Sequence, residues 1–373
     1  MLSNYTAQDK NVPDRWTILK LLAWTEGYFK SYNIDSPRLT AEILLCHSLN
    51  IRRLDLYLQF DRPLNKDELA TYKSLIKRRV KKEPVAYITG NKGFWDSQFA
   101  VTTDVLIPRP DTETLVEAAL EEIEQKRKGQ REGDIVAQNN YSKNNEPEVK
   151  ESKHIDSKTN IKVLELGTGS GAIAVSLAKT NPDVIFFATD ISPKAAIVAK
   201  RNSLNAAISL DSVPPASSLH VSTVSSYSVP VRNERYKESL YLPNLSFLVG
   251  SWFSPIKHGT RFDIIISNPP YIPTDGISTL QQEVRDYEPR LALDGGSDGI
   301  SCLREIMLSA PYYLAPDGVL LMEMGFDQKY KVEYEALKIS QYEAPVFIKD
   351  YAGHNRVVCL KKIRALRGIE AEK

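Results

Sequence analysis

The chain has 373 residues, of which 42% are hydrophobic and 25% are charged, and its formal net charge is +1. This composition is typical of a soluble globular protein, and the length is enough for two domains with sizeable cores. The balanced charge argues against a large electrostatic footprint for nucleic acid, so we do not expect a nucleic-acid partner.

The cysteines and the apolar runs argue against metal-binding and membrane proteins. Cys46, Cys302 and Cys359 are far apart and show no metal-ligand spacing, and no His-Glu-x-x-His sequence occurs. We therefore expect reduced thiols, no metal site and no catalytic zinc. No apolar run has transmembrane length, so no membrane association is expected. Acidic Asp9 and Asp14, with no Arg-rich pattern, make any transit peptide weak.

Residues 1–90 are predicted to form a small helical domain. Ser36-Pro37 is typical of an N-cap followed by proline at the first helical position, and Leu39, Ile43 and Cys46 continue one predicted apolar face. The basic run 77–82 is interpreted as a solvated helix end, with a docking surface for an acidic partner as the alternative. Two further series at helical spacing are Ile18, Leu22, Thr25 and Phe29, and Leu69, Tyr72, Ile76 and Val80.

The character of the chain changes after residue 90. Residues 91–110 are rich in aromatic and β-branched residues and predict a hairpin that acts as a hinge. Residues 111–373 then form the predicted second domain, beginning with a helix at Asp111 or Thr112. Two polar stretches, about 125–159 and 209–240, lack large apolar residues and are predicted to be flexible insertions.

Strand and helix patterns alternate through the second domain, which predicts an α/β fold with a doubly wound, mostly parallel sheet. A final pair of strands, 346–350 and 356–360, predicts an antiparallel hairpin. The other predicted strands are 161–165, 184–190, 245–249, 262–267 and 319–323, and the predicted helices are 172–179, 194–205 and one within 297–314.

A glycine-rich turn follows the first of these strands and predicts a cofactor site. Gly167, Thr168, Gly169, Ser170 and Gly171 lie between the strand and a helix, where glycine permits a sharp turn and close approach of a ligand. Thr168 and Ser170 could alternatively only cap that helix. The Gly-x-Gly-x-Gly spacing differs from the Gly-x-Gly-x-x-Gly of dinucleotide folds.

Acidic and aromatic residues sharpen this prediction. Asp190 ends the next strand, where a carboxylate can accept hydrogen bonds from ribose hydroxyls. Glu165 precedes the turn and would repel a pyrophosphate, so a cationic nucleoside such as S-adenosylmethionine fits better, with Glu165 or its neighbours near the ammonium group. Trp252 follows a later strand and is predicted either to pack on an adenine or to be an interior side chain.

The tetrapeptide Asn268-Pro269-Pro270-Tyr271 ends the strand 262–267 and carries the chemistry. Two prolines end the strand and remove two backbone donors, which leaves the Asn268 side-chain oxygen and nearby carbonyls as acceptors beside an aromatic ring. Such a site suits a planar NH2 group. The alternative interpretation is a plain proline-rich turn.

With these motifs the chain resembles the HemK/PrmC-type release-factor glutamine N5-methyltransferases, and within them the eukaryotic mitochondrial form. The resemblance runs from the N-terminal helices to Leu360, and the two polar stretches are its main departures. The matching segments are Tyr87–Gly90, Gly93–Val101, Leu106–Glu113, residues 163–173, Ser267–Ile272 and Glu283–Leu293 with Gly295, Gly296, Asp298 and Gly299.

The resemblance implies a Rossmann-like class I methyltransferase domain with a seven-stranded, mostly parallel sheet, joined to an N-terminal helical bundle that recognises the release factor. It implies that residues 167–171, Asp190, Trp252 and Asn268 bind S-adenosylmethionine. It further implies that residues 268–271 hold the glutamine of the Gly-Gly-Gln motif of a class 1 peptide release factor.

Several alternatives stay open. Arg109 is predicted to contact the substrate or to order the hinge, with an ion pair at the domain junction as the alternative. Since a planar NH2 also occurs on bases, a DNA or RNA amino-methyltransferase acting on adenine N6 or guanine N2 is the competing function. A scaffold that only binds partners is the non-enzymatic reading. A mitochondrial location is expected, with the cytoplasm as the alternative.

Overall fold

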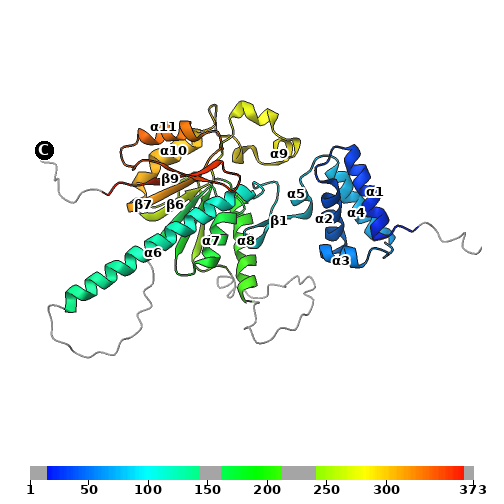
Figure 1. Cartoon of the computed structure of the whole chain (residues 1–373), viewed down its shortest axis with the longest axis horizontal. Coiled ribbons are helices and arrows are strands. Elements are labelled where there is room, and N and C mark those ends of the chain that lie inside the picture. Colours follow the sequence, from blue (N-terminus) through cyan, green and yellow to red (C-terminus); the bar gives the residue numbers. More distant parts are fainter. Residues whose placement is uncertain (1–14, 143–160, 212–240, 365–373) are drawn as a thin grey trace, which may run out of the picture. The chain divides into compact units, whose positions relative to one another are not determined.

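The computed structural model of the protein describes residues 15–142, 161–211 and 241–364 (Figure 1). Its contacts divide the chain into two compact units. The first comprises Met1–Gly90 together with Gln281–Tyr287, and the second comprises Asn91–Leu280 together with Glu288–Lys373.

The first unit is helical, and its described residues share an apolar core. The predicted series Ile18, Leu22, Thr25 and Phe29 is buried on the first helix, and Tyr72 and Ile76 are buried on the fourth. Sequence reasoning missed the three short helices. The helices are α1 (Ile18–Ser31), α2 (Pro37–Leu49), α3 (Arg53–Leu58), α4 (Lys66–Arg79), α5 (Val85–Thr89) and α9 (Gln282–Tyr287).

The predicted apolar face of α2 is wrong. Leu39 and Ile43 are 41% and 36% exposed, whereas the buried face of the helix contains Ala41, Leu44 and Leu45. This face is selected because α2 packs against both α1 and α4, and small Ala41 permits a close approach. Pro37 does occupy the first turn, but the preceding serine makes no capping hydrogen bond through its side chain.

The basic run at the end of α4 is only partly a solvated surface. Arg79 is buried and forms an ion pair with Glu283 of α9. Arg78 pairs with Glu83, at 2.5 Å between Nη2 and Oε1. Lys82 donates to two backbone carbonyls. The predicted solvated helix end therefore holds for the exposed lysines of the run, while its arginines bind neighbouring carboxylates.

The second unit begins with the predicted hairpin, in which β1 (Asn91–Phe94) pairs antiparallel with β2 (Ser97–Ala100). Its main sheet has seven strands in the order β5-β4-β3-β6-β7-β9-β8. The first five in that order are parallel, and β9 pairs antiparallel with both of its neighbours. Its strands are β3 (Lys162–Leu166), β4 (Ile185–Asp190), β5 (Leu245–Val249), β6 (Phe262–Ser267), β7 (Leu314–Glu323), β8 (Val346–Lys349) and β9 (Asn355–Lys361).

Helices cover both faces of this sheet (Figure 1). One face carries α6 (Glu113–Ser142), α7 (Ala172–Thr180) and α8 (Pro193–Asp211), and the other carries α10 (Ser301–Ser309) and α11 (Lys329–Leu337). Each face of the sheet has its own apolar core, the first beneath α6, α7 and α8 and the second beneath α10 and α11. Neighbouring residues of β3 point to opposite faces, so Val163 belongs to the first core and Leu164 to the second. Short 3₁₀ turns at Pro110–Thr112, Thr274–Thr279, Arg290–Ala292 and Ala310–Tyr312 complete the connections.

The predicted start of the first polar insertion is wrong. Helix α6 continues to Ser142, well past residue 125. A composition of Glu, Gln, Lys and Arg predicts an unordered stretch, but these residues have high helix propensities and continue a helix already anchored by buried Ile123. Helix α8 likewise reaches Asp211. The remainders of both predicted insertions lie outside the described residues. Sequence reasoning also missed α11.

Within the described ranges, no helix is both long enough and apolar enough to cross a membrane.

Candidate active site

The sheet brings the two sequence motifs together. Chain order runs outward from β3 through β4 to β5 and then returns to β6 on the other side of β3, so the strand order reverses between β3 and β6. Ligands of open α/β sheets bind at the carboxyl ends of the strands at such a switch point. The glycine turn leaves the end of β3, and Asn268 follows the end of β6.

The glycines of the turn are required by its backbone. Gly167, Gly169 and Gly171 have φ angles of +72°, +56° and +79°. A Cβ atom on Gly171 would lie 3.0 Å from the Cβ of Ala199 in α8, whereas one on Gly169 would meet nothing within 4 Å. The third glycine therefore serves helix packing, while the second leaves open space for a ligand.

Glu165 is buried within the turn. Its Oε2 accepts hydrogen bonds from the Thr168 hydroxyl at 2.6 Å and from the Ala174 amide at 3.1 Å. Burial raises the pKa of Glu165 to about 8, against the lowering effect of these two donors. A carboxyl group with this pKa gains most from a nearby cation, because the cation favours its charged form.

Asp190 closes β4 and orders the same turn. Its Oδ2 accepts from the Gly169 amide at 2.8 Å, and its Oδ1 accepts from the Ser192 amide at 2.8 Å. Burial raises the pKa of this carboxyl group, and the two amides lower it. Each oxygen keeps a further acceptor site, so the carboxylate can still bind hydroxyl groups of a ligand.

Trp252 fits both of its predicted readings. Its side chain lines the cavity beside the turn, and it is also packed against the second apolar core. Its φ angle is +40°, and its carbonyl accepts from the Thr189 hydroxyl at 3.1 Å. This bond holds the tryptophan next to the end of β4.

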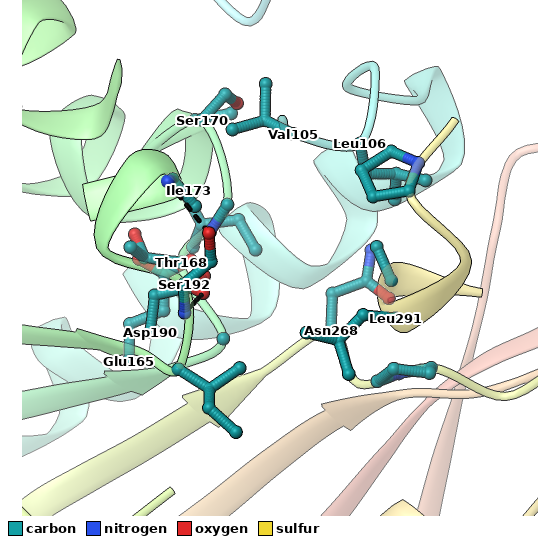
Figure 2. Close-up of a pocket in the computed structure, with 18 of the residues that line it drawn as sticks. Val105, Leu106, Glu165, Thr168, Ser170, Ile173, Asp190, Ser192, Asn268 and Leu291 are labelled. Carbon is teal, nitrogen blue, oxygen red and sulfur yellow. Dashed lines mark hydrogen bonds between the residues drawn. The ribbon is translucent and has the colours of Figure 1, made fainter. Parts of the chain in front are cut away.

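A cavity of about 350 Å³ lies between the two motifs. Figure 2 shows Asn268 and Leu291 on one side of it and Glu165, Thr168 and Asp190 on the other. Of the predicted site residues, Gly171, Pro269 and Tyr271 do not line it. Those that do are Arg109, Glu165, Gly167, Thr168, Gly169, Ser170, Asp190, Trp252, Asn268 and Pro270.

Asn268 and Tyr271 are held by side chains from distant parts of the sequence. Asn268 donates from Nδ2 to the hydroxyl of Thr112 at 3.2 Å. The Tyr271 hydroxyl donates to Oε1 of Glu323 at 3.1 Å, and its backbone carbonyl accepts from Nε2 of Gln328 at 2.7 Å. Both ends of the tyrosine residue are thereby anchored.

The loop after α9 supports the tetrapeptide from outside. Ile272 donates its amide to the Leu293 carbonyl at 3.0 Å, and Gly295 donates to the Ile272 carbonyl at 2.8 Å. A Cβ atom on Gly295 would lie 2.8 Å from the Cα of Tyr271. Only glycine permits this close approach, which keeps the proline backbone in place.

Arg109 forms an ion pair with buried Glu288 and still lines the cavity. The same carboxylate accepts from the Ile107 amide at 3.3 Å. These contacts lie inside the second unit, so they order the segment before α6 over the cavity. A role of Arg109 in substrate binding stays a prediction.

Sequence reasoning did not assign roles to Thr112, Glu323 or Gln328. The only signal for Glu323 was a carboxylate at the end of an apolar strand. Thr112 lies at the predicted helix start and inside the matching segment Leu106–Glu113, and Gln328 had no signal. Among the residues the structure describes, no group of three or more His, Cys, Asp or Glu side chains is placed to hold a metal ion.

A parallel sheet with a glycine turn and a ribose-type carboxylate at its switch point, facing a planar-amine motif, defines a class I methyltransferase. Family models match twice, as the PrmC N-terminal domain over residues 20–90 and as the Methyltransferase small domain over residues 152–233.

Relatives named release factor glutamine methyltransferase align along most of the chain. The one from Geobacter sulfurreducens is 38% identical and covers 85% of this chain and 87% of its own. That from Thermodesulfovibrio yellowstonii is 33% identical over 90% of this chain and 95% of its own. The relative from Vibrio cholerae is 34% identical over 87% of this chain and 89% of its own. The chain belongs to the release factor glutamine methyltransferase family.

The cofactor of a methyltransferase of this family is S-adenosylmethionine. The cavity fits that molecule. Its volume lies in the range of small-molecule sites. Two carboxyl groups, Glu165 and Asp190, are available for the ammonium and the ribose, and Trp252 offers an aromatic surface for the base.

Proposed function

We propose that the protein transfers a methyl group from S-adenosylmethionine to the side-chain amide nitrogen, N5, of the glutamine in the Gly-Gly-Gln motif of a class 1 peptide chain release factor. The observation that carries the proposal is the position of Asn268 across one cavity from the glycine turn. The names of the relatives support the glutamine as the acceptor.

The acceptor nitrogen must be made nucleophilic, because its lone pair is delocalised into the neighbouring carbonyl. Asn268 anchors its own NH2 group on Thr112, which leaves Oδ1 to accept one N–H of the substrate amide. The sequence-based expectation gives the second N–H to the Pro269 carbonyl, although Pro269 is not among the residues that line the cavity. Binding of both N–H groups favours a pyramidal nitrogen with its lone pair turned toward the cofactor side of the cavity.

Neutral acceptors replace a charged base in this arrangement, so acceleration comes from positioning and from oriented dipoles. S-adenosylmethionine supplies an electrophilic methyl group on a sulfonium centre. Glu165 and Asp190 are the residues suited to its ammonium and ribose groups, and apolar Ile173 and Leu291 line the cavity and limit water.

Radiolabelled S-adenosylmethionine tests the proposal directly. The protein is incubated in parallel with a purified class 1 release factor, the same factor with Gly-Gly-Gln changed to Gly-Gly-Ala, duplex DNA and RNA. We expect label on the release factor only, in the peptide that carries the motif, and none after the change to alanine. Label on nucleic acid would instead support the amino-methyltransferase alternative, and label that survives the alanine change would contradict the glutamine assignment.

The compartment is a separate proposal. We propose a mitochondrial location, supported by the resemblance to the mitochondrial form and by the retained N-terminal helical unit. Microscopy of a C-terminally tagged protein tests it, with co-localisation with a mitochondrial marker as the expected result and a diffuse cytoplasmic signal as the contrary one.

A further inference from the structure

Glu323 is a buried carboxylate with an incomplete set of partners. It is the last residue of β7 and is 1% exposed. Its Oε1 accepts from the Tyr271 hydroxyl, whereas its Oε2 has no hydrogen bond of ordinary geometry to any described residue. A buried polar atom without a partner is costly, so its presence calls for an explanation.

Thr112 offers the complementary donor. Its hydroxyl oxygen accepts from Nδ2 of Asn268 at 3.2 Å, which leaves its own hydrogen to be donated elsewhere. The hydroxyl lies close enough to Glu323 to lower the pKa of that carboxyl group. The Thr112 hydroxyl therefore has a hydrogen to donate, and the partnerless Oε2 of its neighbour Glu323 can accept it.

We propose that Thr112 and Glu323 are positioning residues that orient Asn268 and Tyr271 for the methyl transfer. A directional chain of hydrogen bonds runs from the Asn268 NH2 to the Thr112 hydroxyl and from that hydroxyl to Glu323, which also accepts from Tyr271. The inference rests on the proposed function, because it concerns how the acceptor amide is held.

The direction of the chain follows from its end point. An ionised carboxylate only accepts hydrogen bonds, so Thr112 and Tyr271 must both donate to it. With its hydrogen committed to Glu323, Thr112 can only accept from Asn268, which places the NH2 end of the amide on the threonine. The Asn268 oxygen is then the end left for the substrate. In the reverse orientation, the Asn268 oxygen would meet the threonine oxygen, an acceptor against an acceptor, and the Asn268 NH2 would meet the substrate NH2, a donor against a donor.

Ionisation of Glu323 controls this direction. Burial raises the pKa of Glu323 to about 7, while Thr112, Tyr271 and Arg356 lower it. Asp111 raises it further, and Asp350 holds the arginine at 3.1 Å. A protonated Glu323 carries a donor of its own and can donate to the Thr112 oxygen, so the hydrogen bonds no longer have to run from Asn268 through Thr112 to Glu323. Turnover is therefore expected to fall as the pH drops through about 7.

Two substitutions test the chain at saturating S-adenosylmethionine, with the wild-type release factor as substrate. Glu323→Gln keeps the size of the side chain but introduces a permanent donor, and Thr112→Val removes the hydroxyl. We expect each to lower kcat roughly 10- to 100-fold, with cofactor affinity by calorimetry within a few-fold of wild type. Thr112→Ser restores the hydroxyl and should recover most of the rate.

The pH profile separates positioning from mere stability. Wild-type kcat should rise through about pH 7, and Glu323→Gln should be slow and flat over that range. Saturating cofactor keeps the titration of Glu165 and Asp190 out of the profile. Tyr271→Phe is compared with Tyr342→Phe, which removes a buried hydroxyl that donates to the Met307 carbonyl at 2.9 Å, away from the cavity. Only Tyr271→Phe should lower kcat.

The outcomes are distinguishable. An inactive wild-type protein overturns the proposed function itself. If the wild type is active, a normal kcat for Glu323→Gln overturns the inference. So does a fall of the Glu323→Gln kcat below pH 7 like that of the wild type. A loss confined to cofactor affinity or to thermal stability also overturns it. If Glu323→Gln does not fold, the comparison of Thr112→Val with Thr112→Ser decides, and equal rates for those two also overturn it.

Discussion

The cofactor half of the cavity, residues 165–171 with Asp190, and the acceptor half around Asn268 and Tyr271 are built in opposite ways. In the cofactor half, Glu165 bonds a side chain only three residues away. In the acceptor half, Asn268 bonds Thr112 across 156 residues, and Tyr271 bonds Glu323 across 52.

The difference reflects what each half must do. A nucleoside is bound by backbone amides and a carboxylate that one strand, one turn and the next strand supply, so local sequence suffices. An amide that must present its oxygen and not its nitrogen needs fixed polar partners on several sides. Those partners come from any element that the fold places nearby.

Asn268→Ala should give the largest effect and break the acceptor half alone. We expect the methyl-transfer rate to fall by about 100-fold or more, because a contact to the reacting group is lost. Cofactor affinity should stay within several-fold, since the cofactor half is untouched. Single-turnover kinetics and calorimetry measure the two quantities. Unchanged turnover would remove Asn268 from the mechanism.

A matched control for this variant is Asn181→Ala. Asn181 is buried, whereas Asn268 is partly buried, and the Nδ2 of Asn181 donates to the Leu177 carbonyl at 2.8 Å at the end of α7. We expect this variant to lose stability without losing the rate of the remaining folded protein. An equal loss of rate would show that any buried asparagine has the same effect.

Two glycine substitutions dissect the cofactor half with a smaller expected effect. Gly171→Ala combines a positive φ with a Cβ contact of 3.0 Å to Ala199, whereas Gly169→Ala has the positive φ alone. The strained backbone costs about 1–2 kcal/mol in each. We therefore expect Gly171→Ala to lower the melting temperature more, and Gly169→Ala to act mainly on cofactor affinity. Equal melting temperatures would contradict the packing role of Gly171.

The smallest effect concerns the pH dependence of stability without cofactor. The pKa of Glu165 is about 8 in the folded protein against 4.5 ordinarily, so between these values the folded state holds a proton that the unfolded chain has released. Its contribution to the free energy of unfolding is therefore full below about pH 4.5 and is lost as the pH rises through about 8. Glu165→Gln should raise the free energy of unfolding at pH 8 while weakening cofactor binding.

Glu42 has the opposite effect on the pH dependence of the free energy of unfolding. Burial would raise its pKa, but hydrogen bonds from Arg38, Tyr57 and Arg53 lower it overall. Its stabilisation is present above the ordinary value of 4.5 and is lost as the pH falls through the lowered value. Glu42→Gln should thus destabilise the protein at pH 8. Urea unfolding at pH 6 and pH 8 measures both variants, and shifts of the same sign would refute the burial argument for Glu165.

Sequence patterns predicted the sheet well because its strands are short runs rich in aliphatic and aromatic residues, most of them ending at sharp signals. The bounds of β5 and β6 agree with the predicted ones, and the terminal pair is antiparallel as expected. Patterns failed where composition and packing disagree. Polar α6 continues as a helix through its propensity, and α2 buries the face that two neighbouring helices select.

The sequence by itself determined the glycine turn, the carboxylate of Asp190 and the tetrapeptide 268–271, because each depends on residues adjacent in the chain and on backbone geometry that only those residues permit. Tertiary structure alone decided that the two motifs share one cavity, since strand order and not sequence distance sets what meets at the switch point. It also decided the partners of Asn268 and Tyr271. A hydrogen bond depends on distance and direction in space, and no periodicity in the chain encodes the pairing of Asn268 with Thr112 or of Tyr271 with Glu323.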